Sequence, residues 1–161
     1  MTIASLADYK TPRPWLILVA FLVVVIGVGA LIGTQSLPGS WYEGLVKPPF
    51  NPPNWIFGPV WFALYILIAV AGWRIYMIDP DSTPMKLWYG QMVLNWAWSP
   101  VWFLGHLVWP AFAIITALWL LLIVFIVTAK RMDPTSAWLF IPYLAWVSFA
   151  GALNLAIGVL N

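Results

Sequence analysis

The chain has 161 residues, of which 63% are hydrophobic and 7% are charged, and its net charge is +2 at pH 7. Soluble domains carry roughly 25% charged residues, so the charged side chains here are too few to cover a water-facing surface. We therefore predict an all-α, polytopic membrane protein with a five-transmembrane-helix bundle, and we expect no nucleic-acid partner. Cysteine is absent, which excludes disulfides and cysteine metal sites.

The chain begins with a polar stretch, residues 1–14, which we predict to be a cytoplasmic tail. An apolar run follows, and the first membrane span is expected at about residues 15–36. A signal peptide is the competing interpretation. It is disfavoured because the run is longer than an ordinary signal core and no small-x-small cleavage site follows it. The predicted membrane domain therefore covers residues 15–161.

The connection between the first two spans, residues 37–54, is rich in proline and aromatic residues. Two Pro-Pro pairs within residues 48–53 exclude a helix there, because proline lacks an N–H and restrains the residue before it. Pro59 lies about one turn inside the next helix, where the missing N–H costs least. We predict a stiff aromatic lid over the wall of a pocket.

Four further spans are expected, at about residues 55–78, 85–104, 108–129 and 135–159. No Asp, Glu, Lys or Arg occurs from Leu87 to Ala129, and this stretch is too long for one span of about 20 residues. A break near Gly105 and His106 therefore divides it into two helices.

Basic residues are distributed unevenly between the two ends of the predicted bundle. Six of them fall in the tail and in the links on one side, whereas Lys47 alone falls on the other side. By the positive-inside rule, the amino terminus should be cytoplasmic. The lid and the carboxyl terminus should then face outward.

Three predicted helices carry aromatic and amide residues at helical spacing, which places these residues on one face of each helix. The stripes are Phe57, Trp61 and Tyr65 on the second span; Gln91, Asn95, Trp98 and Trp102 on the third; and Pro142, Trp146, Ala150 and Asn154 on the last. One interpretation is that the amides only join helices and the tryptophans only fill the core. Taken together under an aromatic lid, the stripes favour a pocket for a flat, hydrophobic ligand.

No ionisable residue lies near the midplane of a predicted span. Ion-coupled pumps need such a residue, and acid–base, nucleophilic and metal catalysis need clustered titratable or ligating groups. These function classes are therefore disfavoured. The single histidine, His106, lies at a predicted turn. We expect no metal site and no obligatory cofactor.

The chain resembles the translocator protein family in three strings, WYEGLVKPPFNPPNWIFGPVWFALY, GQMVLNWAWSPVWF and PYLAWVSFAGALN. This family is also called TspO/MBR, the tryptophan-rich sensory proteins or the peripheral-type benzodiazepine receptors. The resemblance covers roughly residues 27–155. It implies a five-helix bundle that forms a homodimer and, for a bacterial member, lies in the inner membrane. It also implies a pocket under the lid that binds porphyrins and benzodiazepine-type ligands, and sterols in animal members.

The resemblance implies which residues line this pocket. On the second, third and last spans they are Ile56, Phe57, Gly58, Trp61, Asn95, Trp98, Trp146, Ala150 and Leu153, and looser alignment adds Leu31, Thr34 and Trp109. The aromatic and amide stripes described above add Tyr65 and Gln91 to this ligand-binding set. Animal members end the last helix with a tyrosine followed by a basic residue, and this chain lacks that motif, which argues against sterol recognition through it.

The favoured hypothesis is a membrane receptor or sensor that binds porphyrins, such as protoporphyrin IX or haem-type tetrapyrroles, and regulates tetrapyrrole handling or a stress response. A second hypothesis is an enzyme that degrades porphyrin in light. Trp61 and Trp146 are its candidate catalytic residues, because their equivalents in related bacterial proteins are linked to that reaction. A third is a carrier of porphyrin or sterol-like molecules across the membrane. In each case the expected partners are the flat ligand, membrane lipid and a second copy of the chain.

Overall fold

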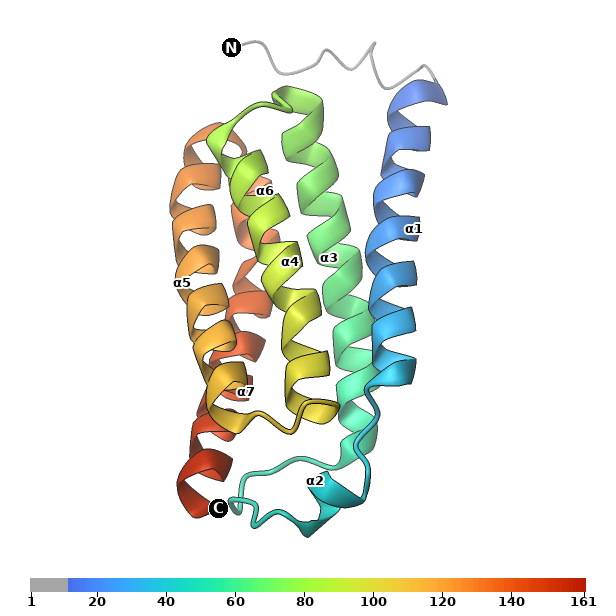
Figure 1. Ribbon diagram of the computed structural model, residues 1–161. Helices are drawn as coiled ribbons and strands as arrows, with labels where there is room; N and C mark the ends of the chain where they lie inside the picture. The colour runs from blue at the N-terminus through green and yellow to red at the C-terminus, as the bar shows by residue number, and fades with distance from the viewer. Residues whose placement is uncertain (1–11) are drawn as a thin grey trace.

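The computed structural model describes residues 12–161, which are mostly helical and contain no strand (Figure 1). The long helices are α1 (Pro12–Gln35), α3 (Phe57–Ile78), α4 (Thr83–Phe103), α5 (Val108–Met132) and α7 (Ile141–Leu160). The shorter ones are α2 (Ser40–Gly44), the 3₁₀ turn η2 (Asn54–Ile56) and α6 (Pro134–Leu139). Most of the predicted cytoplasmic tail lies outside the described residues, and α1 begins at Pro12.

Four helical stretches are long and apolar enough to cross a membrane: residues 13–35, 54–78, 108–132 and 134–160. The fifth long helix, α4, has 21 residues, and at 1.5 Å per residue it spans about 30 Å, the thickness of a bilayer core. It is less apolar because its buried face carries Gln91 and Asn95, and α1, α3 and α5 pack against it. The prediction of an all-α, polytopic membrane bundle is confirmed.

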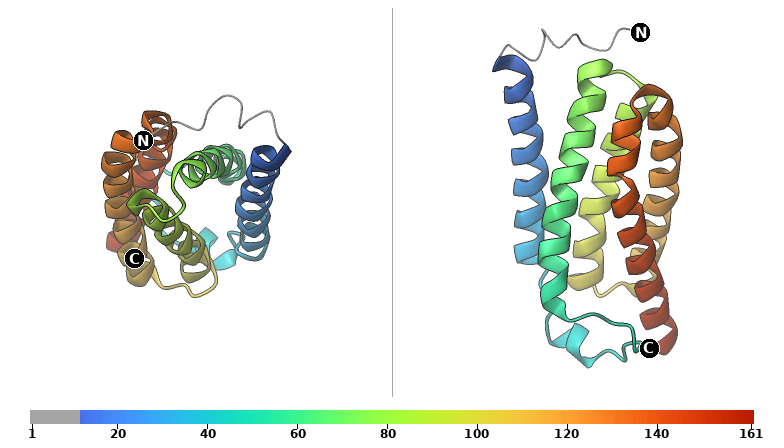
Figure 2. Two further views of the ribbon diagram at one scale, coloured as in Figure 1. Left: turned by 90° about the horizontal axis from the view of Figure 1, so that it is seen from above. Right: turned by 180° about the vertical axis from the view of Figure 1, so that it is seen from behind.

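The long helices pack as neighbours around a shared core. α4 lies along α5, α5 along α7, and α1 along α3. The end-on view shows α1 at one edge of the bundle, beside α3 and α4 and away from α5 and α7 (Figure 2). Fully buried side chains such as Ile68, Met85 and Phe125 fill the centre. α3 and α4 approach closely at Gly72, where the Trp88 indole occupies the space that a side chain would take.

Local signals in the sequence explain where the helices begin. Ser82 caps α4 by accepting a hydrogen bond from the Met85 N–H, and Pro84 lies in the first turn. Asp133 caps α6 in the same way through the Ser136 N–H. Pro59 lies in the first turn of α3, where an N–H has no intrahelical acceptor to lose.

The last predicted span, residues 135–159, is not a single continuous helix. α6 ends at Leu139, Phe140 forms a turn, and α7 begins at Ile141. Pro142 explains this difference, because a proline ring clashes with the carbonyl four residues earlier and supplies no N–H to it. The sequence pattern of apolar residues continues across the break, so hydropathy alone does not reveal it.

An ion pair joins α3 to the turn between α5 and α6. The Arg74 Nε donates to Asp133 Oδ2 at 2.7 Å, and its Nη2 donates to Oδ1 at 2.8 Å. The Ser136 hydroxyl lies 2.6 Å from the same Oδ2. Such two-pronged geometry fixes orientation as well as distance, so this contact holds α3 and α6 in register at one end of the bundle.

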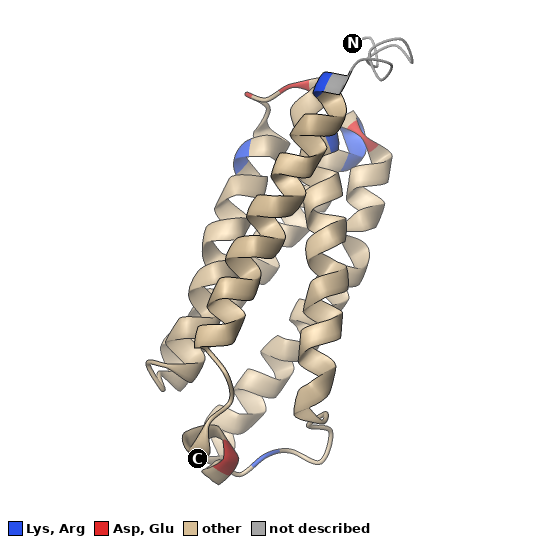
Figure 3. Ribbon diagram, turned by 90° about the vertical axis from the view of Figure 1, so that its right-hand side faces the viewer, with Lys and Arg blue, Asp and Glu red and all other residues tan. Residues whose placement is uncertain are grey.

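Charged residues gather at the two ends of the bundle and leave the middle apolar (Figure 3). Among residues 12–161, the end that carries the start of α1 also holds the basic residues Arg13, Arg74, Lys86, Lys130 and Arg131. The opposite end carries Lys47 and Glu43. This segregation is the pattern of a protein whose middle lies in hydrocarbon.

The predicted lid crosses the end of the bundle from α1 to α3 (Figure 1). Its proline-rich part, residues 47–53, is free of helix as predicted, whereas α2 is a short helix that the sequence did not signal. Ring contacts hold the lid to the bundle: Trp41 meets Trp102 on α4 at 5.8 Å, and Phe50 meets Phe149 on α7 at 6.4 Å. The lid therefore lies against the end of α4 and the side of α7, and hydrogen bonds between Val46 and Asn161 also join it to the end of α7.

Candidate functional site

A chain of hydrogen bonds links α3, α4 and α7 in the centre of the bundle. The Tyr65 hydroxyl donates to Asn95 Oδ1 at 3.2 Å, and Asn95 Nδ2 donates to the Tyr143 hydroxyl oxygen at 2.6 Å. The Tyr143 hydroxyl donates in turn to Gln91 Oε1 at 3.0 Å. Gln91 and Asn95 thus lie on one face of α4, as their spacing predicts, and both are buried.

Aromatic rings surround this polar chain on the side of the lid. Trp61 lies 5.5 Å from Tyr65 and 6.1 Å from Tyr143, measured between ring centroids. Phe57, at the start of α3, meets Trp146 of α7 edge-on at 5.8 Å. Tilted and edge-on contacts are the favoured geometries of aromatic pairs. Residues from α3 and α7 therefore build one aromatic wall.

A second polar contact lies nearer the lid. Trp98 Nε1 donates to Asn154 Oδ1 at 3.2 Å, and Asn154 Nδ2 donates to the Val108 carbonyl oxygen at 3.1 Å. The Trp98 ring also stacks on Trp102, with 6.1 Å between centroids and 9° between planes. Ala150 and Leu153 are buried nearby on α7. This contact ties α4 to α7 and to the first turn of α5.

Two buried donors in this region have no hydrogen-bond partner within residues 12–161. They are Gln91 Nε2, at the end of the central chain of hydrogen bonds, and Trp146 Nε1, in the aromatic wall. An unpaired polar group in a low-dielectric interior is costly, by about 1–3 kcal/mol. Both donors are therefore unsatisfied in the described part of the chain.

Most of the predicted ligand-binding residues come together in this region, and some do not. Phe57, Trp61, Tyr65, Gln91, Asn95, Trp98, Trp146, Ala150 and Leu153 belong to the contacts or the buried faces just described. Ile56 and Gly58 flank Phe57 at the start of α3, and Gly58 is exposed.

The three residues assigned by looser alignment are exposed. Leu31 on α1 is 63% exposed, and the Thr34 hydroxyl donates to its own helix, at the Leu31 carbonyl. Trp109 is 55% exposed at the start of α5. α1 nevertheless borders the cluster, because it packs on α3 and its Gly29 lies directly against the ring of Tyr65.

Tyr143 was missed from the sequence, although it is fully buried and joins α7 to two amides of α4. Its signal is present in the chain. Tyr143, Val147, Ala150 and Asn154 recur at spacings of four, three and four and are all buried. The predicted stripe began one residue earlier, at Pro142, which is exposed.

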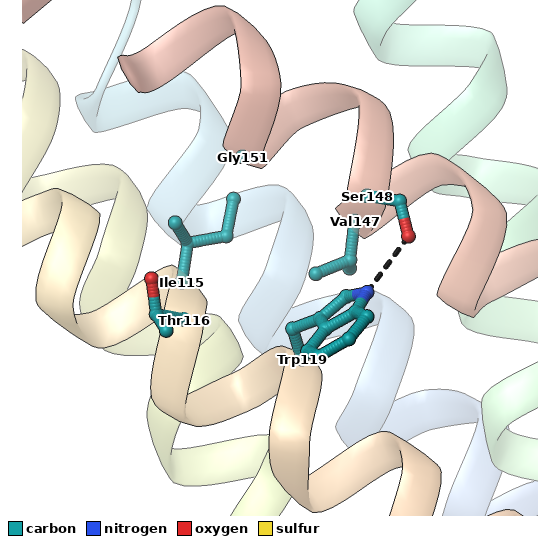
Figure 4. Close-up of a pocket in the computed structure, with 6 residues that line it drawn as sticks. All are labelled: Ile115, Thr116, Trp119, Val147, Ser148 and Gly151. Carbon is teal, nitrogen blue, oxygen red and sulfur yellow. Dashed lines mark hydrogen bonds between the residues drawn. The ribbon is translucent and has the colours of Figure 1, made fainter.

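A hollow of about 300 Å³ opens on the surface between α5 and α7, away from this site (Figure 4). Trp119 Nε1 donates to Ser148 Oγ at 2.8 Å, and the Ser148 hydroxyl donates to the Leu144 carbonyl oxygen. Thr116 donates to the Phe112 carbonyl oxygen. The polar groups of this hollow are therefore satisfied within α5 and α7, by bonds inside each helix and by one bond between them. It contains none of the predicted ligand-binding residues.

The sequence pattern of the TspO/MBR family matches residues 17–160. The chain is 31% identical over 140 residues to the tryptophan-rich sensory protein of Cereibacter sphaeroides, an alignment that covers 87% of this chain and 88% of that one. It is 34% identical over 152 residues to the translocator protein of Ovis aries, covering 88% of each. It is 37% identical over 150 residues to the tryptophan-rich protein TspO of Archaeoglobus fulgidus, covering 89% of this chain and 96% of that one.

Proposed function

This chain belongs to the TspO/MBR family of membrane receptors and sensors, and from that premise we propose that it binds a porphyrin between α3, α4 and α7, beneath the lid. Benzodiazepine-type compounds, which are also flat and hydrophobic, are proposed to enter the same site. Occupation of the site would then report the tetrapyrrole level to the cell.

The unpaired donor of Trp146 is the observation that carries this proposal. Its indole N–H is buried and has no acceptor among residues 12–161, and its ring lies 5.8 Å from Phe57 in the aromatic wall. A porphyrin supplies a planar face for the aromatic rings and acceptor oxygens for a free donor. Binding would thus offset the cost of the unpaired N–H and add ring stacking.

Ring stacking rather than iron ligation is proposed to hold the guest. His106 lies in the turn between α4 and α5, where its ring stacks on Trp41 with 4.3 Å between centroids. A haem iron needs only one axial ligand besides the porphyrin nitrogens, and the single histidine of the sequence belongs to this turn and not to the proposed site. Free-base protoporphyrin and haem are therefore expected to bind with comparable affinity.

Titration of protoporphyrin into the wild type and into Trp146→Phe tests the proposal. Phenylalanine keeps an aromatic ring and removes the N–H. The loss of one hydrogen bond, worth about 1–1.5 kcal/mol, should weaken binding about 5- to 10-fold. The matched control is Trp138→Phe, because Trp138 lies on α6 and is 70% exposed. Equal affinity in the wild type and in both Trp146→Phe and Trp146→Ala would refute the site.

The chain is an integral membrane protein, and we propose that it lies in a bacterial inner membrane with the lid outward. The support is the excess of Lys and Arg at the end opposite the lid. The chain has no cysteine, so single substitutions report topology cleanly. An impermeant thiol reagent added to intact cells with a permeabilised outer membrane should label Lys47→Cys and leave Lys86→Cys unmodified. Labelling of Lys86→Cys but not of Lys47→Cys would show the opposite orientation, with the lid facing the cytoplasm.

A further inference from the structure

A hollow of about 470 Å³ lies at the lid end of the bundle, outside the proposed porphyrin site. Trp41 and Leu45 of the lid form one side, and the turn and first residues of α5 form the other, from His106 to Pro110. The end of α7 closes it with Gly158 and Asn161. Its volume falls within the range of about 300–1,000 Å³ that is usual for small-molecule sites.

The lining of this hollow combines aromatic faces with free polar edges. Trp41 and His106 stack at 4.3 Å with 17° between their planes, and Trp109 is more than half exposed. His106 has φ 55°, in the left-handed region that non-glycine residues seldom adopt. Its ring is exposed, and an imidazole presents one donor and one acceptor at its edge. A planar ring with polar substituents fits this chemistry.

The walls of the hollow are fixed to one another. The Asn161 side chain accepts from the Val46 N–H at 2.9 Å and donates to the Val46 carbonyl oxygen at 3.0 Å, so the end of α7 holds the lid in place. Tyr42 of the lid donates to Asn51 Oδ1 at 2.9 Å. A site with pre-positioned walls loses less conformational entropy when a ligand binds.

A row of rings leads from this hollow toward the porphyrin site. Trp41 meets Trp102 edge-on at 5.8 Å. Trp102 stacks on Trp98 at 6.1 Å, and the Trp98 indole is bonded to Asn154 of α7. Ring contacts through Trp102 and Trp98 of α4 thus connect the outer hollow with the inner site.

We propose that this hollow is a second, outer binding station, in which a planar tetrapyrrole lies against Trp109 and the Trp41–His106 pair before it reaches the inner site. The inference rests on the proposed function for the identity of the guest, and it adds a site that the inner cluster does not contain. The edge of the tetrapyrrole ring, rather than a metal bound in it, would contact His106.

Counting bound protoporphyrin distinguishes the two sites. The full chain is placed in lipid nanodiscs, and binding to empty nanodiscs is subtracted. The wild type should bind two equivalents per chain. Trp109→Ala, which removes one wall of the outer station, should bind one equivalent with the affinity of the inner site. Trp138→Ala, a loss of an exposed tryptophan at the other end of the bundle, should still bind two.

The outcomes separate the inference from the proposed function. One equivalent in the wild type, unchanged in Trp109→Ala and lost in Trp146→Ala, would overturn the outer station and leave the inner site intact. Two equivalents that survive Trp109→Ala would also overturn it. If Trp109→Ala loses one equivalent of bound protoporphyrin and Trp146→Ala loses none, the result would support the outer station and overturn the inner site.

Discussion

Tyr143 is the residue through which α7 shares hydrogen bonds with α4 in the centre of the bundle. It accepts from Asn95 and donates to Gln91, and no part of it is exposed. Hydrogen bonds between membrane helices are worth about 0.6–2 kcal/mol each, because the unfolded chain in lipid also finds partners. Two of them at one hydroxyl make that single oxygen atom important for holding α4 and α7 together.

Tyr143→Phe should therefore lower the free energy of unfolding by about 1–3 kcal/mol, since it removes both hydrogen bonds and strands two buried amides. Denaturation in detergent, followed by circular dichroism, measures the change. Tyr89→Phe is the matched control, because Tyr89 lies on α4, the helix to which Tyr143 is bonded, and is 48% exposed. A Tyr143→Phe protein as stable as the control would show that the amides find other partners.

At the scale of the element, the ion pair between Arg74 and Asp133 connects α3 to the start of α6. Burial alone would raise the pKa of the Asp133 carboxyl, but the hydrogen bonds from Arg74 and Ser136 outweigh it and lower the pKa below its usual value. Because the folded pKa lies below the unfolded one, the ionised carboxylate stabilises the fold. This contribution is complete above the unfolded pKa of about 3.9 and is lost as the pH falls through the folded pKa.

Asp133→Asn should remove this stabilisation and keep the helix cap, because Asn caps helices as well as Asp does. At pH 7 we expect the free energy of unfolding to fall by about 1–3 kcal/mol, a value between those for exposed and for buried ion pairs. Thermal unfolding of the variant and the wild type should converge as the pH drops below about 4. Asp81→Asn, at an exposed position, is the control. A difference between wild type and variant that is the same at pH 7 and pH 3 would contradict the assigned role of the carboxylate.

The helices also show which features the sequence determines. The spacing of Gln91, Asn95 and Trp102 identified the buried face of α4, because polar residues in an apolar helix leave few alternatives. α1 is different: its exposed side, with Leu16 and Val23, and its buried side, with Val25, are both apolar, so no pattern in the sequence fixes its rotation. For that reason the positions of Leu31 and Thr34 relative to the site were not predictable from residue spacing.

One local feature followed from the sequence, and two did not. The Pro-Pro pairs correctly excluded a helix from residues 47–53, because a missing N–H is a local property. The short helix α2 depends on how the lid packs on the end of the bundle. The break at Phe140 comes from Pro142, but the apolar pattern continues across it and does not reveal it. Tyr143 was overlooked because the stripe on the last span was read at exact spacings of four, and each such step turns about 40° around a helix of 3.6 residues per turn. The predicted stripe therefore shares Ala150 and Asn154 with the buried face and departs from it at Pro142.

For the whole molecule, the arrangement forms a bundle with charges at both ends, an apolar exterior and a polar and aromatic centre under a fixed lid. Among residues 12–161, the buried donors Gln91 Nε2 and Trp146 Nε1 have no hydrogen-bond partner. Under the proposed function, this centre is the place where a flat guest would gain both stacking and hydrogen bonds.

The indole N–H signals of ¹⁵N-tryptophan-labelled protein, followed by NMR during titration with protoporphyrin, test this site most directly. The Trp146 signal is assigned with Trp146→Phe. We predict that it moves strongly on binding, from the new hydrogen bond and the ring current of the guest, together with the Trp61 signal. The signals of Trp119 and Trp138, which lie outside the site, should stay in place. Movement of those two signals with an unchanged Trp146 signal would contradict a guest bound between α3, α4 and α7.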